Sequence, residues 1–140
     1  MRVGLYPGSF NPFHQGHLNI LEKAEKIFDK VIIARGVNPE KKNVIMPMPN
    51  AIADRTWVNY NGLLTDFIKT LPYDNITVIR GLRNGVDLQY ELNQYRYFQD
   101  LMPDIQMISI FCDKEFEHIS SSGIRMLSQY GEDHVKKYLL

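Results

Sequence analysis

The N-terminal part of the chain restricts the fold more than any other feature of the sequence. An alternating apolar segment, Arg2–Tyr6, gives way to the turn-forming pair Pro7-Gly8. From His17 onward, apolar residues recur at helical spacing, which predicts an amphipathic helix of about three turns. Val31–Ala34 is a short apolar run rich in β-branched residues, typical of a buried strand. Strand, helix and strand in so short a stretch predict a βαβ unit with parallel strands and a right-handed crossover.

The same alternation continues to the end of the chain. The polar, proline-containing segment Asn38–Asn50 predicts a loop. The expected elements beyond it are a helix over Gly62–Thr70, a strand over Asn75–Arg80, a helix over Asp87–Met102, a strand over Ile105–Phe111 and a helix over Ser120–Tyr130. We therefore expect an α/β fold, a Rossmann-like doubly wound parallel sheet in a single domain spanning residues 1–140. Such sheets bind ligands beyond the carboxyl ends of their strands, where the strand order reverses.

Composition excludes several classes of function. Sixteen basic residues balance sixteen acidic ones, so no general attraction to nucleic acid or to an anionic membrane is expected. Cys112 is the only cysteine, which rules out an internal disulfide, and its neighbours Ile110 and Phe111 indicate an inert thiol at a buried strand end. The N-terminus lacks an apolar signal core and no apolar run is long enough to span a bilayer, so a cytoplasmic protein is expected.

The segment Gly8–His17, between the first strand and the first helix, has the composition of a phosphate-binding loop. Gly8 and Gly16 let the backbone approach a ligand closely, and the helix start offers free N–H groups and the positive end of the helix dipole. His14 and His17 can share one face of the first turn and each donate a hydrogen bond to a phosphoryl oxygen. A histidine pair alone is more often a surface feature, but the glycines and the strand–loop–helix setting favour the phosphate site. No Cys, Asp or Glu completes a metal-ligand set nearby, so no metal site formed by protein side chains is expected.

Two basic segments follow later strands. Lys41-Lys42 lies in the polar loop, where a lysine can reach over the site and balance phosphate charge, although such a loop pair is usually solvated. Arg80-Gly81-Leu82-Arg83 directly follows a strand and suits a phosphate clamp. An equally good interpretation pairs these arginines with Asp87 and Glu91 on the next helix, and the sequence leaves both open.

The run Ser120-Ser121-Ser122 begins the last helix. One hydroxyl suffices to cap a helix, whereas three offer further donors to a phosphate. We expect Arg125 in the first turn, where the helix dipole disfavours a cation and a bound anion would relieve the conflict. The chain contains no Walker-type glycine-rich lysine motif and no Gly-x-Ser-x-Gly, which argues against a P-loop kinase and an α/β-hydrolase.

Taken in order, these motifs resemble the nucleotidyltransferase superfamily with the (His/Thr)-x-Gly-His signature. The resemblance covers most of the chain and rests on Tyr6–Pro12, Gly16–Leu18, Phe28–Val31, Lys41-Lys42, Arg80–Arg83 and Ile119–Ser122. Three further stretches, Arg80–Glu91, Asn61–Phe67 and Leu101–Pro103, are most similar to bacterial phosphopantetheine adenylyltransferase. That resemblance implies transfer of AMP from ATP to 4′-phosphopantetheine, giving dephospho-coenzyme A and pyrophosphate, with Mg²⁺ accompanying ATP. It also implies a homo-oligomer.

The resemblance assigns roles residue by residue. His17 and Ser9 would contact the α-phosphate of ATP, His14 would share that role or reach the β-phosphate, and Lys41 would bridge the acceptor and α-phosphates. The expected ATP-binding set is Gly8, Ser9, Phe10, His14, Gly16, His17, Gly81, Arg83, Glu91, Ser120, Ser121, Ser122 and Arg125. The expected acceptor-binding set is Ser9, Lys41, Leu63, Leu64 and Arg80, with Arg80 on the acceptor phosphate.

The chain departs from that family's pattern in several places. His14 stands where threonine is usual, giving the form common in nicotinamide mononucleotide adenylyltransferases and cytidylyltransferases. Asn11 replaces an aspartate, and Phe98 replaces an asparagine expected to contact the acceptor. The region between Lys42 and Trp57 is shorter by about one helix, and the chain after Gly131 is short as well.

Two other functions therefore remain open. Phe98 and Trp57 could supply the stacking surface that nicotinamide mononucleotide prefers, whereas Leu63 and Leu64 suit the apolar pantetheine arm. That makes nicotinamide mononucleotide adenylyltransferase, or another nucleotidylyltransferase of the superfamily, the first alternative. A nucleotide-binding relative with impaired catalysis is the second.

Overall fold

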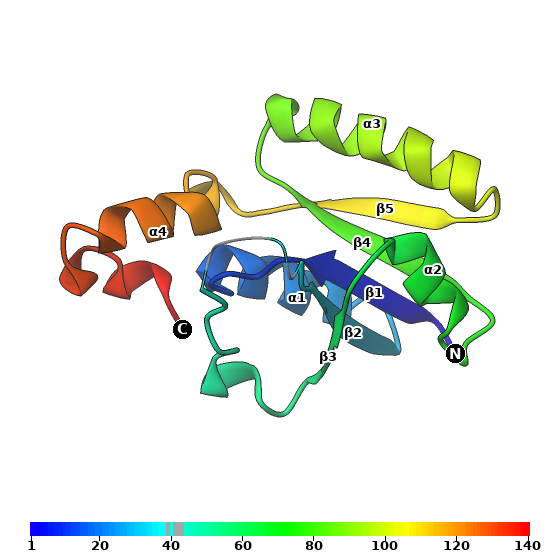
Figure 1. The fold of residues 1–140 in the computed structure, drawn as a ribbon, viewed down its shortest axis with the longest axis horizontal. Helices are drawn as coiled ribbons and strands as arrows, with labels where there is room; N and C mark the ends of the chain where they lie inside the picture. The colour runs from blue at the N-terminus through cyan, green and yellow to red at the C-terminus, as the bar shows by residue number, and fades with distance from the viewer. Residues whose placement is uncertain (39, 41–43) are drawn as a thin grey trace.

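The computed structural model describes residues 1–38, 40 and 44–140. Its sheet has five parallel strands in the order β3-β2-β1-β4-β5 (Figure 1). The strands are β1 Val3–Gly8, β2 Lys30–Gly36, β3 Thr56–Tyr60, β4 Ile76–Leu82 and β5 Gln106–Phe111. The chain winds outward from β1 in both directions, so the strand order reverses between β1 and β4. The expected α/β, doubly wound fold is confirmed.

Helices cover both faces of the sheet, and each face has its own hydrophobic core. The helices are α1 Gln15–Glu25, α2 Leu64–Lys69, α3 Gly85–Leu101 and α4 Ser121–Ser128. On one face, Ile20 and Leu21 of α1 pack against Ile33 and Ile79 of the sheet. On the other face, α2 and α3 pack against Leu5, Ala34 and Val78. Figure 1 shows α4 beyond the end of the sheet, with the N- and C-termini at opposite ends of the molecule.

The two central strands separate before they end. β1 pairs with β2 as far as Gly8, but its pairing with β4 covers only Val3–Leu5. Pro7, which we expected in a turn together with Gly8, therefore lies inside β1. Proline has no backbone N–H to donate. At Pro7 this matters little, because the side of the backbone that would carry the N–H faces β4, and the pairing of β1 with β4 has already ended at Leu5. The Pro7 carbonyl on the same side accepts a hydrogen bond from Arg80 Nη1 at 3.0 Å.

One strand was missed by the sequence analysis. β3 is an edge strand that pairs only with β2, and only Val58 and Tyr60 pack against the core. Its sequence, Thr-Trp-Val-Asn-Tyr, has neither a continuous apolar run nor a strict alternation of apolar and polar residues. Neither of the usual sequence patterns therefore indicates a strand here. In the described part of the chain, no helix combines the length and the apolar character needed to cross a membrane.

Candidate active site

A cavity of about 330 Å³ opens at the carboxyl end of the sheet, where β1 and β4 diverge. We call it the first cavity. It brings together segments that are far apart in the sequence: the loop after β1, the start of α1, the end of β4, one face of α3 and the start of α4. Residues from these segments that line it are Gly8, Ser9, Phe10, His14, Gly16, His17, Arg80, Gly81, Arg83, Asp87, Tyr90, Glu91, Ser120 and Ser121. Most of the expected ATP-binding residues therefore face one space.

His14, the N-cap of α1, and His17, in the first turn of that helix, form a stacked pair held by hydrogen bonds. Their ring centroids are 3.7 Å apart and their planes differ by 24°. His14 caps α1, because its Nδ1 accepts from the Gly16 N–H at 3.1 Å, while His17 Nδ1 accepts from the His14 N–H at 3.0 Å. A Cβ on Gly16 would lie 2.9 Å from His14 Cε1, so only glycine lets the ring pack over the helix start. His14 thus serves the helix start, and it does so from a buried position at the cavity wall, not at the surface.

Burial keeps both histidines neutral near pH 7. It lowers the pKa of His14 to about 4, with the positive charge of Arg83 acting in the same direction. It lowers the pKa of His17 well below its ordinary value, assisted by His14, Arg83 and Arg80. Because each Nδ1 accepts a backbone hydrogen bond, we assign the proton of each neutral ring to Nε2. Each ring can then donate one N–H to a phosphoryl oxygen.

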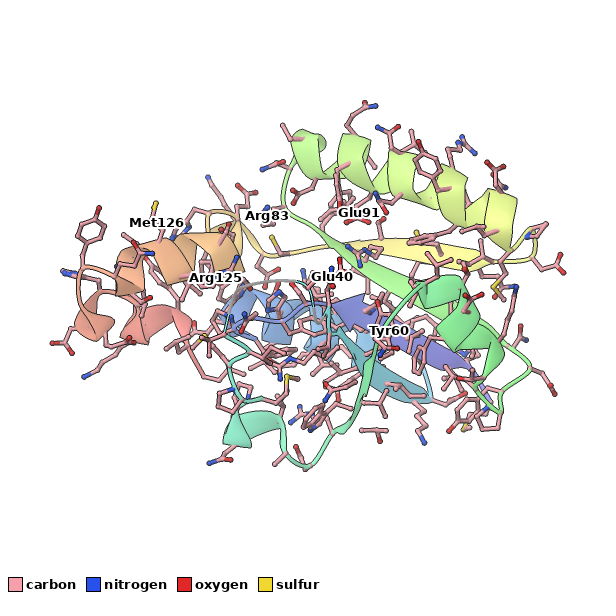
Figure 2. The ribbon with its side chains drawn as sticks, in the orientation of Figure 1. Glu40, Tyr60, Arg83, Glu91, Arg125 and Met126 are labelled. Atoms are coloured by element: carbon pink, nitrogen blue, oxygen red, sulfur yellow. The ribbon has the colours of Figure 1, made fainter. Side chains whose placement is uncertain are left out.

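Arg80 is fixed by a carboxylate. Its Nε and Nη2 donate to the two Glu91 oxygens at 2.7 and 2.8 Å, and Nη1 donates to the Pro7 carbonyl. Glu91 is buried on the inner side of α3, and Figure 2 shows it on the side of α3 that faces β4. The Glu91 carboxylate neutralises Arg80 and fixes the plane of its guanidinium, so any phosphate contact would be made by the remaining N–H groups of an oriented donor.

Arg83, which follows β4, is paired in the same way with Asp87, one turn before Glu91 on α3. Its Nε and Nη2 donate to Asp87 at 2.9 and 3.1 Å, and Nη1 donates to the Ile119 carbonyl at 3.3 Å. Both pairings that the sequence left open are therefore present. They do not exclude ligand contact, because Arg83 and Arg80 both line the first cavity.

A second cavity, of about 530 Å³, lies on the β2–β3 side of the same loop. Five residues line both cavities: Pro7, Gly8, Ser9, Arg80 and Tyr90. The far wall of the second cavity comes from Tyr60 at the end of β3, Leu64 of α2, and Gln94 and Phe98 of α3. Figure 2 labels Tyr60 and Glu40, which also lines this cavity. The two spaces meet at Ser9, whose side chain is exposed between them.

Some expected site residues lie elsewhere. Lys41 falls outside the described residues, so its expected role stays a prediction. Leu63 is 52 % exposed and does not line the second cavity, because the start of α2 turns Leu64 inward instead. Ser122 is exposed and absent from the first cavity, and its hydroxyl lies 3.4 Å from that of Ser120. Trp57 lines neither cavity, whereas Phe98 lines the second.

Arg125 and Cys112 are placed differently from our expectation. α4 begins at Ser121, so Arg125 lies beyond the first turn of that helix. Arg125 lines a separate, smaller cavity, whereas His14 and His17 line the first cavity. Cys112 follows β5 and is half-buried: it packs against the hydrophobic core on the α1 face and also lines the wall of the first cavity. Burial raises the pKa of its thiol, which agrees with the expected lack of reactivity.

Comparison with known proteins identifies the family of this chain. A cytidylyltransferase-like family model matches residues 5–127. The chain is 34 % identical to the phosphopantetheine adenylyltransferase of Clostridium botulinum, covering 94 % of this chain and 87 % of that protein. It is 37 % identical to the phosphopantetheine adenylyltransferase of Mycoplasma capricolum, with 93 % and 99 % covered.

The chain belongs to the phosphopantetheine adenylyltransferase family. Among solved structures, it is similar to a protein proposed to be a nicotinate-nucleotide adenylyltransferase, from Vibrio parahaemolyticus. The TM-score is 0.67, with 18 % identity, 99 % of this chain covered and 86 % of that one. At that identity the likeness establishes a shared nucleotidyltransferase fold only. The cytidylyltransferase-like family model begins within β1 and covers the other four strands and every residue that lines the first and second cavities.

Proposed function

We propose that this protein transfers AMP from ATP to 4′-phosphopantetheine, giving dephospho-coenzyme A and pyrophosphate. The observation that carries the proposal is the pair of cavities that share Ser9, Gly8 and Arg80. Two substrates bound one in each cavity would bring their phosphates together at this loop. Such a junction suits a reaction in which positioning supplies most of the rate enhancement.

ATP occupies the first cavity in this proposal. Its α-phosphate lies near Ser9 and His17, and its β- and γ-phosphates lie toward Arg83 and the start of α4, where Ser120 and Ser121 line the wall. The acceptor phosphate then attacks the α-phosphorus from the second cavity, the α–β bridging bond breaks, and pyrophosphate leaves. No general base is needed because the acceptor phosphate is already an anion.

The neutral histidines stabilise charge that develops at the α-phosphate. The Nε2–H groups of His17 and His14 are held by backbone hydrogen bonds on the opposite side of each ring, so they need not reorient during the reaction. Donors oriented in advance are worth about 2–4 kcal/mol each in a transition state. Lys41 would bridge the acceptor and α-phosphates, and its replacement by alanine should slow turnover more than it weakens ATP binding.

Mg²⁺ enters this proposal with ATP. In residues 1–38, 40 and 44–140, no three His, Cys, Asp or Glu side chains converge to hold an ion. The two carboxylates of the first cavity, Asp87 and Glu91, are both engaged with arginines. These residues fit a cation held by triphosphate oxygens and water, which is usual for Mg²⁺, and that cation would neutralise charge on the leaving pyrophosphate. Since ATP is the donor, we place the reaction in the cytoplasm.

The second cavity favours a long acceptor. Leu64 supplies an apolar wall, and Asn61, Gln94 and Tyr60 provide polar groups along it, as a pantetheine arm with its amides requires. The aromatic rings of Tyr60 and Phe98 on the same wall keep nicotinamide mononucleotide as the second candidate, because its base could stack there.

Pyrophosphate release from Mg·ATP distinguishes these possibilities. We expect the highest kcat/KM with phosphopantetheine among a panel that also contains nicotinamide mononucleotide, and choline and glycerol phosphates with CTP. Faster turnover of nicotinamide mononucleotide would transfer the assignment to the second candidate. ATP binding without pyrophosphate release for any acceptor would indicate a relative with impaired catalysis.

A further inference from the structure

A third, smaller cavity lies next to the loop between β1 and α1, and none of the contacts proposed above is placed in it. Its volume is about 50 Å³, and Ser9, Asn11, Arg35 and Arg125 are among its lining residues. No carboxylate lines it in the described part of the chain, while two arginines do. A space of this size holds about three water molecules, or one small tetrahedral oxyanion.

Arg35 is buried at the end of β2 with part of its guanidinium unpaired. Only 4 % of the residue is exposed. Its Nη2 donates to the Phe10 carbonyl at 3.2 Å and also to the Met46 carbonyl. Its Nε is buried and has no hydrogen-bond partner among the described residues. Burial also lowers the pKa of this guanidinium, because desolvation penalises the charge. A buried charged donor without a partner is costly unless a ligand satisfies it.

Arg125 approaches the same place from α4, where Figure 2 labels it. Its Nη1 donates to the Asn11 carbonyl, which directly follows the Phe10 carbonyl that Arg35 contacts. The two guanidiniums therefore donate to the carbonyls of two consecutive residues in the loop between β1 and α1. Carbonyl oxygens satisfy individual N–H groups, but they do not neutralise two like charges held beside one small space.

We propose that the space between Arg35 and Arg125 binds a tetrahedral oxyanion of the phosphate type, with the Ser9 residue at its edge. Planar guanidiniums with free N–H groups are suited to such an ion. The oxyanion has two possible sources, the terminal phosphoryl group of ATP or free inorganic phosphate. The first source rests on the proposed binding of ATP in the first cavity, with the γ-phosphate extending past Ser9 into the third cavity instead of lying toward Arg83; the second source does not.

Calorimetric titration with inorganic phosphate tests this site directly. The protein is first saturated with AMP, which lacks a terminal phosphate, and ionic strength is held constant. We expect one phosphate to bind per chain. Arg35→Gln and Arg125→Gln should each weaken that binding about tenfold or more, the usual effect of removing a hydrogen bond to a charged group. Arg96→Gln, the same change on the exposed side of α3, is the matched control and should leave it unchanged.

Thermal melting separates the proposed site from a purely structural role of Arg35. If Arg35→Gln lowers the melting temperature but both arginine variants bind phosphate as the wild type does, Arg35 merely anchors the Met46 carbonyl and the proposal is wrong. If Arg35→Gln does not fold, Arg125→Gln decides in the same way, since its side chain is only half-buried.

A second titration identifies the source of the oxyanion. With ATP in place of AMP and no acceptor present, loss of phosphate binding assigns the site to the terminal phosphoryl group, and retention assigns it to free phosphate. Binding is read without turnover, so a failure of the proposed reaction leaves this result interpretable. If AMP does not bind, the titration on the free protein with the same variants still tests the two arginines.

Discussion

The protonation of His14 leads to a specific prediction about how the free energy of unfolding depends on pH. The folded protein holds this ring neutral, with a pKa lowered from 6.5 to about 4, while the unfolded chain has the ordinary value. Below pH 6.5 the unfolded chain binds a proton that the folded protein does not, so stability is lost as pH falls from 6.5 towards 4. A pKa difference of one corresponds to about 1.4 kcal/mol, so His14 accounts for about 3 kcal/mol over that whole interval and about 2 kcal/mol by pH 5.

His14→Asn isolates this contribution. Asparagine is a good helix N-cap and can accept from the Gly16 N–H, so the exchange removes the titrating ring while keeping the cap. Urea unfolding at pH 7 and pH 5 should show a pH-dependent loss of stability that is smaller in the variant than in the wild type by about 2 kcal/mol. His17 contributes in the same direction and remains in both proteins. The same exchange at His134, exposed near the C-terminus, is the control. An equal loss in wild type and His14→Asn would refute the burial of a neutral His14.

Three further outcomes are expected. His17→Ala should fold normally and lose about two orders of magnitude in kcat, because it removes an oriented transition-state donor; near-normal turnover removes His17 from the mechanism. Leu64→Asp should raise the KM for phosphopantetheine and leave the Kd of ATP nearly unchanged, since Leu64 lines only the second cavity, and an unaffected acceptor KM would contradict the placement. Glu91→Ala should lower the free energy of unfolding by about 3 kcal/mol by leaving the Arg80 charge without its partner. Chemical denaturation measures this, and a loss below about 1 kcal/mol would place the pair in a solvent-screened setting.

Local sequence patterns predicted most of the fold because the elements concerned are long or contain a strongly apolar, buried segment. The helix expected over Asp87–Met102 is α3, Gly85–Leu101, and the strand expected over Asn75–Arg80 is β4, Ile76–Leu82. β3 escaped prediction because an edge strand with one packed side needs no strong apolar pattern. Pro7 was misplaced because its tolerance inside β1 depends on where the pairing with β4 stops, which is a tertiary property.

The candidate site was predictable where it is local in sequence. The loop Gly8–His17 carries its own signals, and the structure places its glycines and histidines at one cavity. The engagement of Arg80 with Glu91 could not be decided, because it depends on how α3 packs over β4. Arg35 gave no signal at all: an arginine directly after an apolar run is normally expected at the surface, and only the contacts of Phe10 and Met46 show that it is buried.

The two large cavities are lined largely by different helices and strands, which bears on how an enzyme of this fold can change its acceptor. Of these two, α1 and α4 line only the first cavity, the donor side in the proposed reaction, whereas the ends of β2 and β3 and the start of α2 line only the second cavity, the proposed acceptor side. A lineage, or a designer, can therefore exchange the acceptor by altering Tyr60, Leu64 or Phe98 while the phosphate chemistry at Ser9 stays intact. Gln94 and Phe98 lie one turn apart on α3, so a single helical stripe offers a compact set of positions for selecting new acceptors.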